Sequence, residues 1–343
     1  MKTICIVGGA PGSLVNFRGE LILRFVKSGN RVYALAGIAS EKEKKDIEAL
    51  GVTFVEVPIS RTSTNPLEDI KTYRFYKHFF NKVSPDIVLS YTIKPVIWSG
   101  LALLKLPKVK FYALVTGLGY AFKGQSIKQK LLRKIVSHLY RKSLSRAEKV
   151  IFQNSDDLSF FTDTKICSKS KTTTVSGSGV PIDQFAYKHL PERPTIFLMI
   201  ARLLKEKGII EYLKAAKIVK KSYPEVSFQV LGPLDPSPDG LSKEDLGHLN
   251  NRGVVEYLGK TIDVRPYLAN CHIFVLPSFY GEGLPRTILE AMATGRAVLT
   301  TDSVGCREPI VEGENGCLVP VKDSKSLAEK MIWFIEHPEQ LKE

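Results

Sequence analysis

Short apolar runs alternate with longer amphipathic stretches along most of the chain, and this pattern predicts alternating strands and helices. The runs are rich in β-branched residues, as in strands that are buried on both faces of a parallel sheet. They lie at 4–7, 32–36, 53–57, 87–90, 111–115, 150–152 and 175–180 in the first half, and at 195–201, 227–231, 254–258, 273–277 and 297–300 in the second. This β-α-β-α order predicts an α/β fold.

The length of 343 residues exceeds one ordinary hydrophobic core and predicts two domains. The segment 181–194 carries three prolines and is the predicted interdomain linker. We therefore expect two Rossmann-like, doubly wound parallel-sheet domains, one over 1–185 and one over 186–343. Hydrophobic residues at 44% and charged residues at 24% are typical of globular proteins.

The stretch 273–301 has the most informative pattern. A predicted strand at 273–277 leads into a loop, and a helix at 286–294 is predicted to begin behind Pro285 and to end at Gly295. Proline suits the first helical position because its missing N–H has no helical partner there. Glycine suits the left-handed residue that ends many helices. The stretch is therefore one strand-loop-helix unit, followed by a second strand.

This unit carries two carboxylates, Glu282 in the loop and Glu290 on the helix. The loop lies at the carboxyl end of its strand, where open α/β sheets bind ligands. A carboxylate accepts two hydrogen bonds at once, which suits the vicinal hydroxyls of a sugar or ribose. The helix N-terminus offers N–H groups to a phosphate. Taken alone, however, Glu290 could be an ordinary glutamate on a surface helix.

The segment FVLPS, then EGLPRTILEAMATG, then a strand and Thr301-Asp302, resembles the E-x7-E signature of family 4 glycosyltransferases. Members of that family are retaining, nucleotide-sugar-dependent enzymes of GT-B architecture, with two Rossmann-like domains facing across a cleft. The resemblance implies a UDP-sugar donor, with Glu282 at the reacting sugar and Glu290 on the ribose. It also assigns Gly283, Leu284 and Pro285 to donor binding.

Two further segments of the second half match the family. Arg202 and Lys207 correspond to the basic pair that family members place on the donor diphosphate, where fixed cations stabilise the departing UDP. Lys205 lies nearby but outside the pattern. A solvated basic loop is the alternative for this segment. Gly259 and Lys260 follow a predicted strand at the place where the family lays the nucleotide base against backbone.

The first predicted strand is followed by the loop GGAPG, which lacks the G-x-G-x-x-G fingerprint. In the family this loop, with Gly9, lies near the reacting sugar and the donor phosphates; a plain β–α turn is equally compatible with the residues. Asn16 and Arg18 follow on the predicted helix 14–28. Arg18 is placed to meet an acceptor phosphate, or it could be a solvated helix residue.

The segment YTIKP at 91–95 is predicted to form a polar turn that closes the strand at 87–90. It resembles, together with TGLGYAF at 116–122, segments of relatives that build bacterial surface polysaccharides. The resemblance implies a polyprenyl-diphosphate-linked saccharide as acceptor, with Lys94, Thr116 and Gly117 in its site. Many relatives carry a histidine near Thr116 that contacts the donor sugar. A threonine cannot carry charge, so the donor stays open between an N-acetylhexosamine and a hexose.

No D-x-D motif occurs, and the six histidines are scattered without ligand spacing, so neither a metal nor a cofactor is expected. The resemblance implies front-face attack, in which the leaving phosphate takes the proton of the acceptor hydroxyl. Two rivals stay open. One is a sugar-nucleotide epimerase of the same fold. The other is a basic nucleic-acid-binding protein, although the usual aromatic-plus-basic RNA motifs are missing and no nucleic-acid partner is expected.

Positive charge is concentrated in the first half. Residues 1–190 hold 30 Lys and Arg against 14 Asp and Glu, a net charge of +16, while the remainder has 19 against 21. Such asymmetry indicates that one domain meets an anionic surface. A predicted basic amphipathic helix at 127–146 could bind an anionic membrane, or it could use its whole apolar face in the domain core.

Five cysteines without C-x-x-C spacing indicate a reducing cytoplasm. The first residues are interpreted as a buried strand rather than a signal peptide. The apolar run at 96–104 is well short of the ~20 residues that span a bilayer. We therefore expect a cytoplasmic protein that is peripheral on the inner face of the cytoplasmic membrane.

Overall fold

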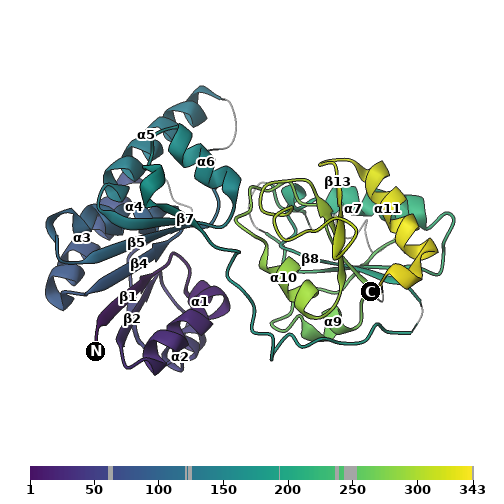
Figure 1. Ribbon diagram of the computed structural model, residues 1–343, viewed down its shortest axis with the longest axis horizontal. Helices are drawn as coiled ribbons and strands as arrows, with labels where there is room; N and C mark the ends of the chain where they lie inside the picture. Colours follow the sequence, from purple (N-terminus) through teal and green to yellow (C-terminus); the bar gives the residue numbers. More distant parts are fainter. Residues whose placement is uncertain are drawn as a thin grey trace. The chain divides into compact units, whose positions relative to one another are not determined.

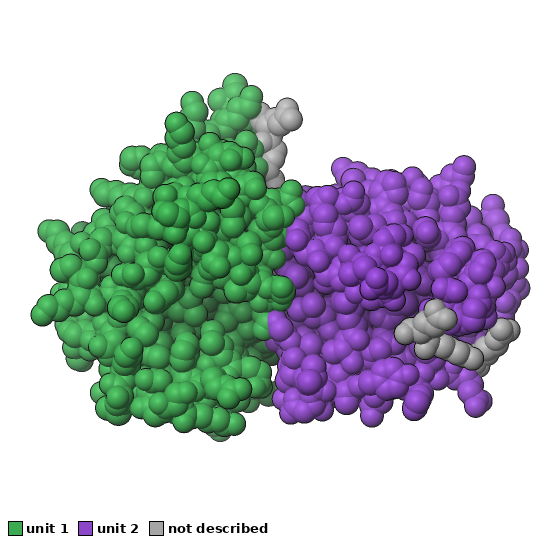
Figure 2. All heavy atoms as spheres, viewed as in Figure 1, with its two compact units in different colours: residues 1–178 green, residues 179–343 purple. Residues whose placement is uncertain are grey.

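The computed structural model describes residues 1–60, 65–119, 122, 126–192, 194–235, 239–242 and 253–341. The chain folds as two compact units, Met1–Ser178 and Gly179–Glu343 (Figure 2). The predicted proline-rich linker therefore belongs to the second unit.

The first unit contains a fully parallel seven-stranded sheet in its described part, in the order β3-β2-β1-β4-β5-β6-β7 (Figure 1). Its strands are β1 (Thr3–Val7), β2 (Arg31–Ala36), β3 (Thr53–Glu56), β4 (Ile87–Tyr91), β5 (Lys110–Val115), β6 (Ala147–Phe152) and β7 (Thr172–Thr174). Its helices are α1 (Pro11–Lys27), α2 (Glu41–Glu48), α3 (Pro66–Val83), α4 (Ile93–Ala102), α5 (Ile127–Leu144) and α6 (Ser155–Asp163).

Successive side chains of each central strand enter two different cores, because they point to opposite faces of the sheet. Cys5 and Val7 of β1 join a core that includes residues of α3, α4 and α5. Ile4 and Ile6 join the core that includes residues of α1 and α2. Both faces are therefore covered, which explains why the strands form unbroken apolar runs.

The second unit has a parallel six-stranded sheet among its described residues, in the order β10-β9-β8-β11-β12-β13. The strands are β8 (Ile196–Ile200), β9 (Ser227–Leu231), β10 (Glu256–Tyr257), β11 (Ile273–Leu276), β12 (Ala297–Thr301) and β13 (Gly316–Val319). The helices are α7 (Ile209–Val219), α9 (Arg265–Ala269), α10 (Arg286–Ala293) and α11 (Ser324–Glu336). The predicted fold class, two doubly wound α/β units, is confirmed.

Three local predictions were wrong. Residues 175–180 form no strand because Gly177 and Gly179 adopt positive φ, and the strand lies earlier, at the polar Thr172–Thr174. The strand predicted at 254–258 is shorter, because only Glu256 and Tyr257 pair with β9. The segment 91–95 is not a turn: α4 begins at Ile93, and its proline stands in the first turn, where a missing N–H costs little.

Candidate active site

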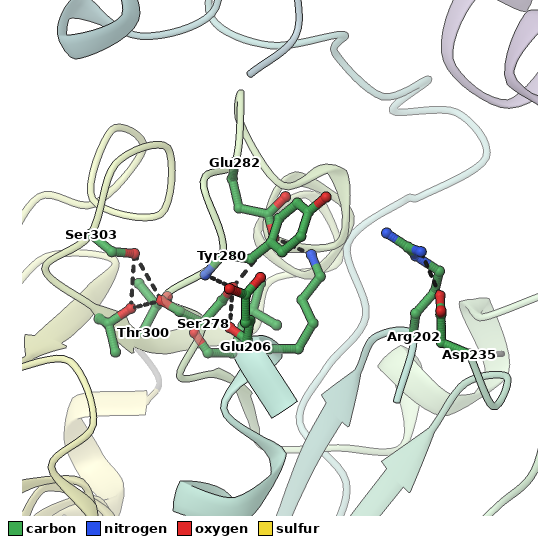
Figure 3. A network of polar contacts seen from close by, with 11 residues as sticks. Arg202, Glu206, Asp235, Ser278, Tyr280, Glu282, Thr300 and Ser303 are labelled. Atoms are coloured by element: carbon green, nitrogen blue, oxygen red, sulfur yellow. Dashed lines mark hydrogen bonds and ion pairs between the residues drawn. The ribbon is translucent and has the colours of Figure 1, made fainter. Parts of the chain in front are cut away.

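The order of strands reverses between β8 and β11 in the second unit, since β9 and β10 lie on one side of β8 and β12 and β13 lie beyond β11. Ligands of doubly wound sheets bind at such a switch point, outside the carboxyl ends of the strands. The segments that follow β8 and β11 carry the predicted residues Arg202, Lys207 and Glu282. Figure 3 shows Arg202 and Glu282 in these segments.

Lys207 and Glu282 meet at this switch point. The Lys207 ammonium donates to Glu282 Oε1, and each side chain is only 13% exposed. Lys207 Nζ also lies 5.1 Å from the centroid of the Tyr280 ring. Ser278 Oγ donates to the same carboxylate oxygen over 3.3 Å. The fold therefore brings together two predicted residues from distant segments and buries most of both side chains.

Backbone contact holds the two segments at this spacing. Gly208, just after Lys207, has a φ of +78°, and a Cβ there would lie 1.9 Å from the carbonyl oxygen of Pro277. The N–H of Phe279 donates to the carbonyl of Glu206 over 2.9 Å. Glycine is required at 208 because only a residue without a Cβ allows this approach.

The loop after β12 supports the Glu282 loop from another side. Gly305 has a φ of +82°, and a Cβ there would lie 2.7 Å from the carbonyl oxygens of Glu282 and Gly283. The hydroxyl of Thr301 donates to the carbonyl of Ser278. The hydroxyl of Ser303 donates to the same carbonyl over 2.8 Å (Figure 3). These backbone-directed bonds fix the loop, so Glu282 is held on a rigid base.

Arg202 is positioned by a different partner. Its Nη1 donates to Asp235 Oδ2 over 2.6 Å, and the Asp235 side chain is 9% exposed while that of Arg202 is 41% exposed. Figure 3 shows this pair as a separate group from the Glu282 cluster. Asp235 was missed in the sequence; it lies beyond β9, the strand next to β8, and that adjacency is the signal that would have found it.

Glu290 is buried on α10 and accepts a 2.8 Å hydrogen bond from Arg286 Nε, one turn earlier. Burial raises the pKa of the Glu290 carboxyl, and the Arg286 guanidinium opposes that rise. An ordinary surface glutamate is therefore the wrong interpretation. Pro285 was predicted at the first helical position, but it occupies the N-cap position, one residue before the helix begins. Gly295 ends the unit with a φ of +80°, as predicted.

The remaining predicted donor residues line the same edge of the sheet. Leu284 is buried, and Gly283 shares the loop that Gly305 supports. Gly259 follows β10 with a φ of +76°, and its carbonyl accepts a 2.8 Å hydrogen bond from the N–H of Gly232. Lys260 is exposed beside it. A Cβ at Gly259 would meet no atom within 4 Å, so the backbone there is open to an incoming group.

In the first unit, Arg18 is buried, with only 5% of its surface exposed. Its guanidinium lies 4.9 Å from the Tyr91 ring centroid, and Tyr91 shares a 2.8 Å hydrogen bond with Ser13. Burial raises the pKa of Tyr91 to about 12. A Cβ at Gly8 would stand 2.3 Å from the Tyr91 hydroxyl. Arg18 is therefore no solvated helix residue, and Tyr91, which positions it, was missed.

Gly9, which was predicted to bind the donor, and the other predicted acceptor residues follow the carboxyl ends of neighbouring strands β1, β4 and β5. A Cβ at Gly9 would lie 3.5 Å from the Thr92 hydroxyl, so the loops after β1 and β4 touch. Lys94 Nζ forms a 2.9 Å ion pair with Asp69 at the start of α3. Thr116 and Gly117 follow β5 directly, and Asn16 lies on α1. These residues lie near one another because β1, β4 and β5 are neighbours in the sheet, although they are far apart in the sequence.

Within the described ranges, no three or more His, Cys, Asp or Glu side chains are grouped so that they could hold a metal ion. Binding without a metal stays a prediction. In the same part of the chain, no helix combines the length and apolarity needed to cross a membrane.

Comparison with known proteins adds to this geometry. Residues 182–343 match the family model described as Glycosyl transferases group 1, and residues 21–154 match Glycosyl transferase 4-like. Solved structures share the fold. They include a glycosyltransferase from Rickettsia africae, with a TM-score of 0.76, 18% identity and coverage of 99% of this chain and 90% of that one. Another is Anabaena HepE in complex with UDP, with a TM-score of 0.75, 17% identity and coverage of 99% of this chain and 92% of that one.

Two curated relatives match over nearly the whole chain. One is the N,N'-diacetylbacillosaminyl-diphospho-undecaprenol alpha-1,3-N-acetylgalactosaminyltransferase of Campylobacter jejuni, 29% identical over 95% of this chain and 88% of the relative. Another is the capsular polysaccharide biosynthesis glycosyltransferase CapM of Staphylococcus aureus, which is 24% identical over 96% of this chain and 87% of the relative.

The fold and these matches together define a glycosyltransferase of GT-B architecture. Within that class, its first half matches the Glycosyl transferase 4-like model, in agreement with the family 4 resemblance of its E-x7-E segment, and one curated relative is named for capsular polysaccharide biosynthesis.

Proposed function

We propose that this enzyme is a retaining transferase that moves an N-acetylhexosamine or a hexose from a UDP-sugar to a polyprenyl-diphosphate-linked saccharide. The observation that carries the proposal is the contact between Lys207 and Glu282 at the switch point of the second unit. A cation for the diphosphate and a carboxylate for the sugar hydroxyls stand side by side there, on loops fixed by backbone hydrogen bonds.

The donor site uses four charged side chains in three roles. Lys207 and Arg202 contact the diphosphate and stabilise the negative charge that grows as UDP departs. Glu282 accepts hydrogen bonds from the transferred sugar. Glu290, buried on α10, accepts hydrogen bonds from the ribose hydroxyls. UDP bound in the similarly folded HepE supports a nucleotide of this type.

The acceptor site belongs to the first unit. Arg18, held against Tyr91, and Lys94, paired with Asp69, offer cations at the carboxyl ends of adjacent strands. An acceptor diphosphate would bind to them. The Campylobacter relative is named for a diphospho-undecaprenol acceptor, which supports this chemistry.

In the transfer step, the acceptor hydroxyl oxygen forms a bond to the anomeric carbon on the face from which UDP leaves. The bond between that carbon and the β-phosphate oxygen breaks, and the departing phosphate takes the hydroxyl proton. The anomeric configuration is retained. Lys207 and Arg202 supply the charge stabilisation, so the step as proposed involves no metal.

A membrane-bound acceptor requires an enzyme that works at the membrane surface. We propose that the protein is peripheral on the inner face of the cytoplasmic membrane and that its basic first unit faces anionic lipid. The net charge of +16 on residues 1–190 supports this arrangement.

The test combines a panel of UDP-sugars with a polyprenyl-diphosphate-linked saccharide and follows product mass. We expect one UDP-sugar to extend the acceptor by a single residue, with activity that survives EDTA. NMR of the product should show the anomeric configuration of the donor. An inverted product, loss of activity in EDTA that manganese restores, or epimerised UDP-sugar without transfer would each contradict the proposal.

A further inference from the structure

Helix α5 presents an exposed apolar stripe. Ile127 is 86% exposed, Leu131 59% and Ile135 49%. These residues are spaced four apart, so they lie on one side of the helix on successive turns. We call Ile127, Leu131 and Ile135 the outer stripe.

The opposite side of the same helix is already used by the core. Val136, Tyr140 and Leu144 are buried in the cluster that also contains residues of α3 and α4. The sequence alone allowed a helix whose whole apolar content packs on the domain. Core packing accounts for the inner residues but not for the outer stripe.

The cations of α5 divide in the same way. Arg133 Nη2 donates to the carbonyl of Phe122 over 2.8 Å, and Arg141 Nε donates to that of Lys165 over 2.9 Å, so both arginines hold loops of the unit. Lys128, Lys130, Lys134 and Lys142 are exposed. At 100° per residue the first three of these lysines flank the outer stripe, and Lys142 lies on the same side nearer the helix C-terminus. The helix contains no acidic residue.

We propose that the outer stripe and its three flanking lysines dock the first unit on an anionic lipid bilayer. An apolar stripe between lysines matches the boundary between acyl chains and headgroups, where apolar side chains enter and cations meet anionic lipid. Charge complementarity favours lipid over a protein partner, since the unit as a whole is strongly basic.

The position of the stripe deepens the proposed function, on which its biological purpose rests. Helix α5 follows the segment after β5 that carries Thr116 and Gly117, so Ile127 marks its end nearer the acceptor site. A bilayer against the outer stripe would bring a membrane-anchored diphosphate to the carboxyl edge of the same sheet.

The experiment is co-sedimentation of the full chain with vesicles of phosphatidylglycerol and phosphatidylcholine, without donor or acceptor. The stripe variant is Ile127→Ser, Leu131→Ser and Ile135→Ser. The lysine variant is Lys128→Gln, Lys130→Gln and Lys134→Gln. A matched control, Lys105→Gln, Lys108→Gln and Lys110→Gln, removes the same charge from exposed lysines at the amino end of β5.

We expect the parent and the control to bind equally, and the stripe variant to bind at least tenfold more weakly at every salt concentration. Binding of the lysine variant should depend much less on salt, because the three lysines it lacks are the surface charges that salt screens in the parent. UDP affinity, measured by calorimetry, should not change in either variant.

Equal sedimentation of the stripe variant and the parent would overturn the proposal. So would equal losses in the lysine variant and the control, which would indicate a general effect of charge. Light scattering that shows an oligomeric parent and a monomeric stripe variant would assign the stripe to self-association instead. Because the assay contains no substrate, it succeeds or fails independently of transferase activity.

Discussion

Lys207 and Glu282 neutralise one another where the donor is expected to bind, with both side chains largely buried. A buried charge without a partner is costly, and removing one member of such a pair strands the other. In the proposed complex, the diphosphate takes over Lys207 and the sugar hydroxyls take over Glu282. The ion pair therefore keeps both charges in position until the substrate replaces it.

Glu290 gives a prediction at the same scale. Glu290→Gln should weaken UDP binding about tenfold or more, since hydrogen bonds to a charged group contribute roughly 1.5–3 kcal/mol. Calorimetry measures this, with Glu329→Gln on α11 as a control at an exposed position. Equal UDP affinity in both variants would remove Glu290 from the site.

The raised pKa of Glu290 also sets a pH dependence. UDP affinity should fall on acidification at a higher pH than for an ordinary glutamate, because a protonated carboxyl accepts less well, and Glu290→Gln should lack that fall. Stability changes in the opposite sense. A carboxyl with a raised folded pKa favours the native state below its unfolded pKa, and that contribution is lost as pH rises through the folded pKa. Affinity can therefore be lost at this group while the fold is retained.

At the scale of elements, Gly208 determines how close the β8 and β11 segments lie. Gly208→Ala combines positive φ with a Cβ 1.9 Å from a backbone oxygen. Gly313→Ala is the matched control, because Gly313 has a φ of +82° but a Cβ there would meet no atom within 4 Å. We expect Gly313→Ala to cost only about 1–2 kcal/mol, for the backbone conformation.

Gly208→Ala should cost more than this, because the two segments must also move apart. The midpoint of thermal unfolding compares the two variants, and UDP calorimetry reports the site. We expect a lower midpoint and lost UDP binding for Gly208→Ala alone. Equal midpoints and equal UDP affinity would show that the contact between Gly208 and Pro277 does not hold the site together.

The central strands could be predicted from the sequence because burial on both faces makes them continuous apolar runs. The edge strand Thr172–Thr174 could not be predicted, because it is polar and largely exposed and pairs on one side only. Helix α4 was missed for the opposite reason. Its residues are buried on most sides, so no helical period separates apolar from polar positions.

Candidate site residues within one segment could be predicted from their local pattern, as Glu282 and Glu290 were. Partners contributed by a neighbouring strand could not be, because strand order is not written in any local pattern. Asp235 holds Arg202 from the loop after β9, and Tyr91 holds Arg18 from the end of β4. Both become recognisable only once the sheet order is known.

At the scale of the whole molecule, the two units differ in net charge: the first is strongly basic and the second is almost neutral. In the function we propose, the basic first unit binds an anionic acceptor at a membrane, and the second places Lys207 and Arg202 at its switch point. This division agrees with matches to two separate family models, one within each unit. We propose that the donor diphosphate departs at this switch point of the second unit.

Turnover at saturating donor in Lys207→Ala, beside Lys205→Ala, tests that claim most directly. Lys205 is an exposed lysine two residues away, so the pair differs in position rather than in chemistry. The account predicts near-normal turnover for Lys205→Ala and a loss of roughly 100-fold or more for Lys207→Ala, with a smaller change in donor affinity. Equal turnover in the two variants, both folded, would contradict it.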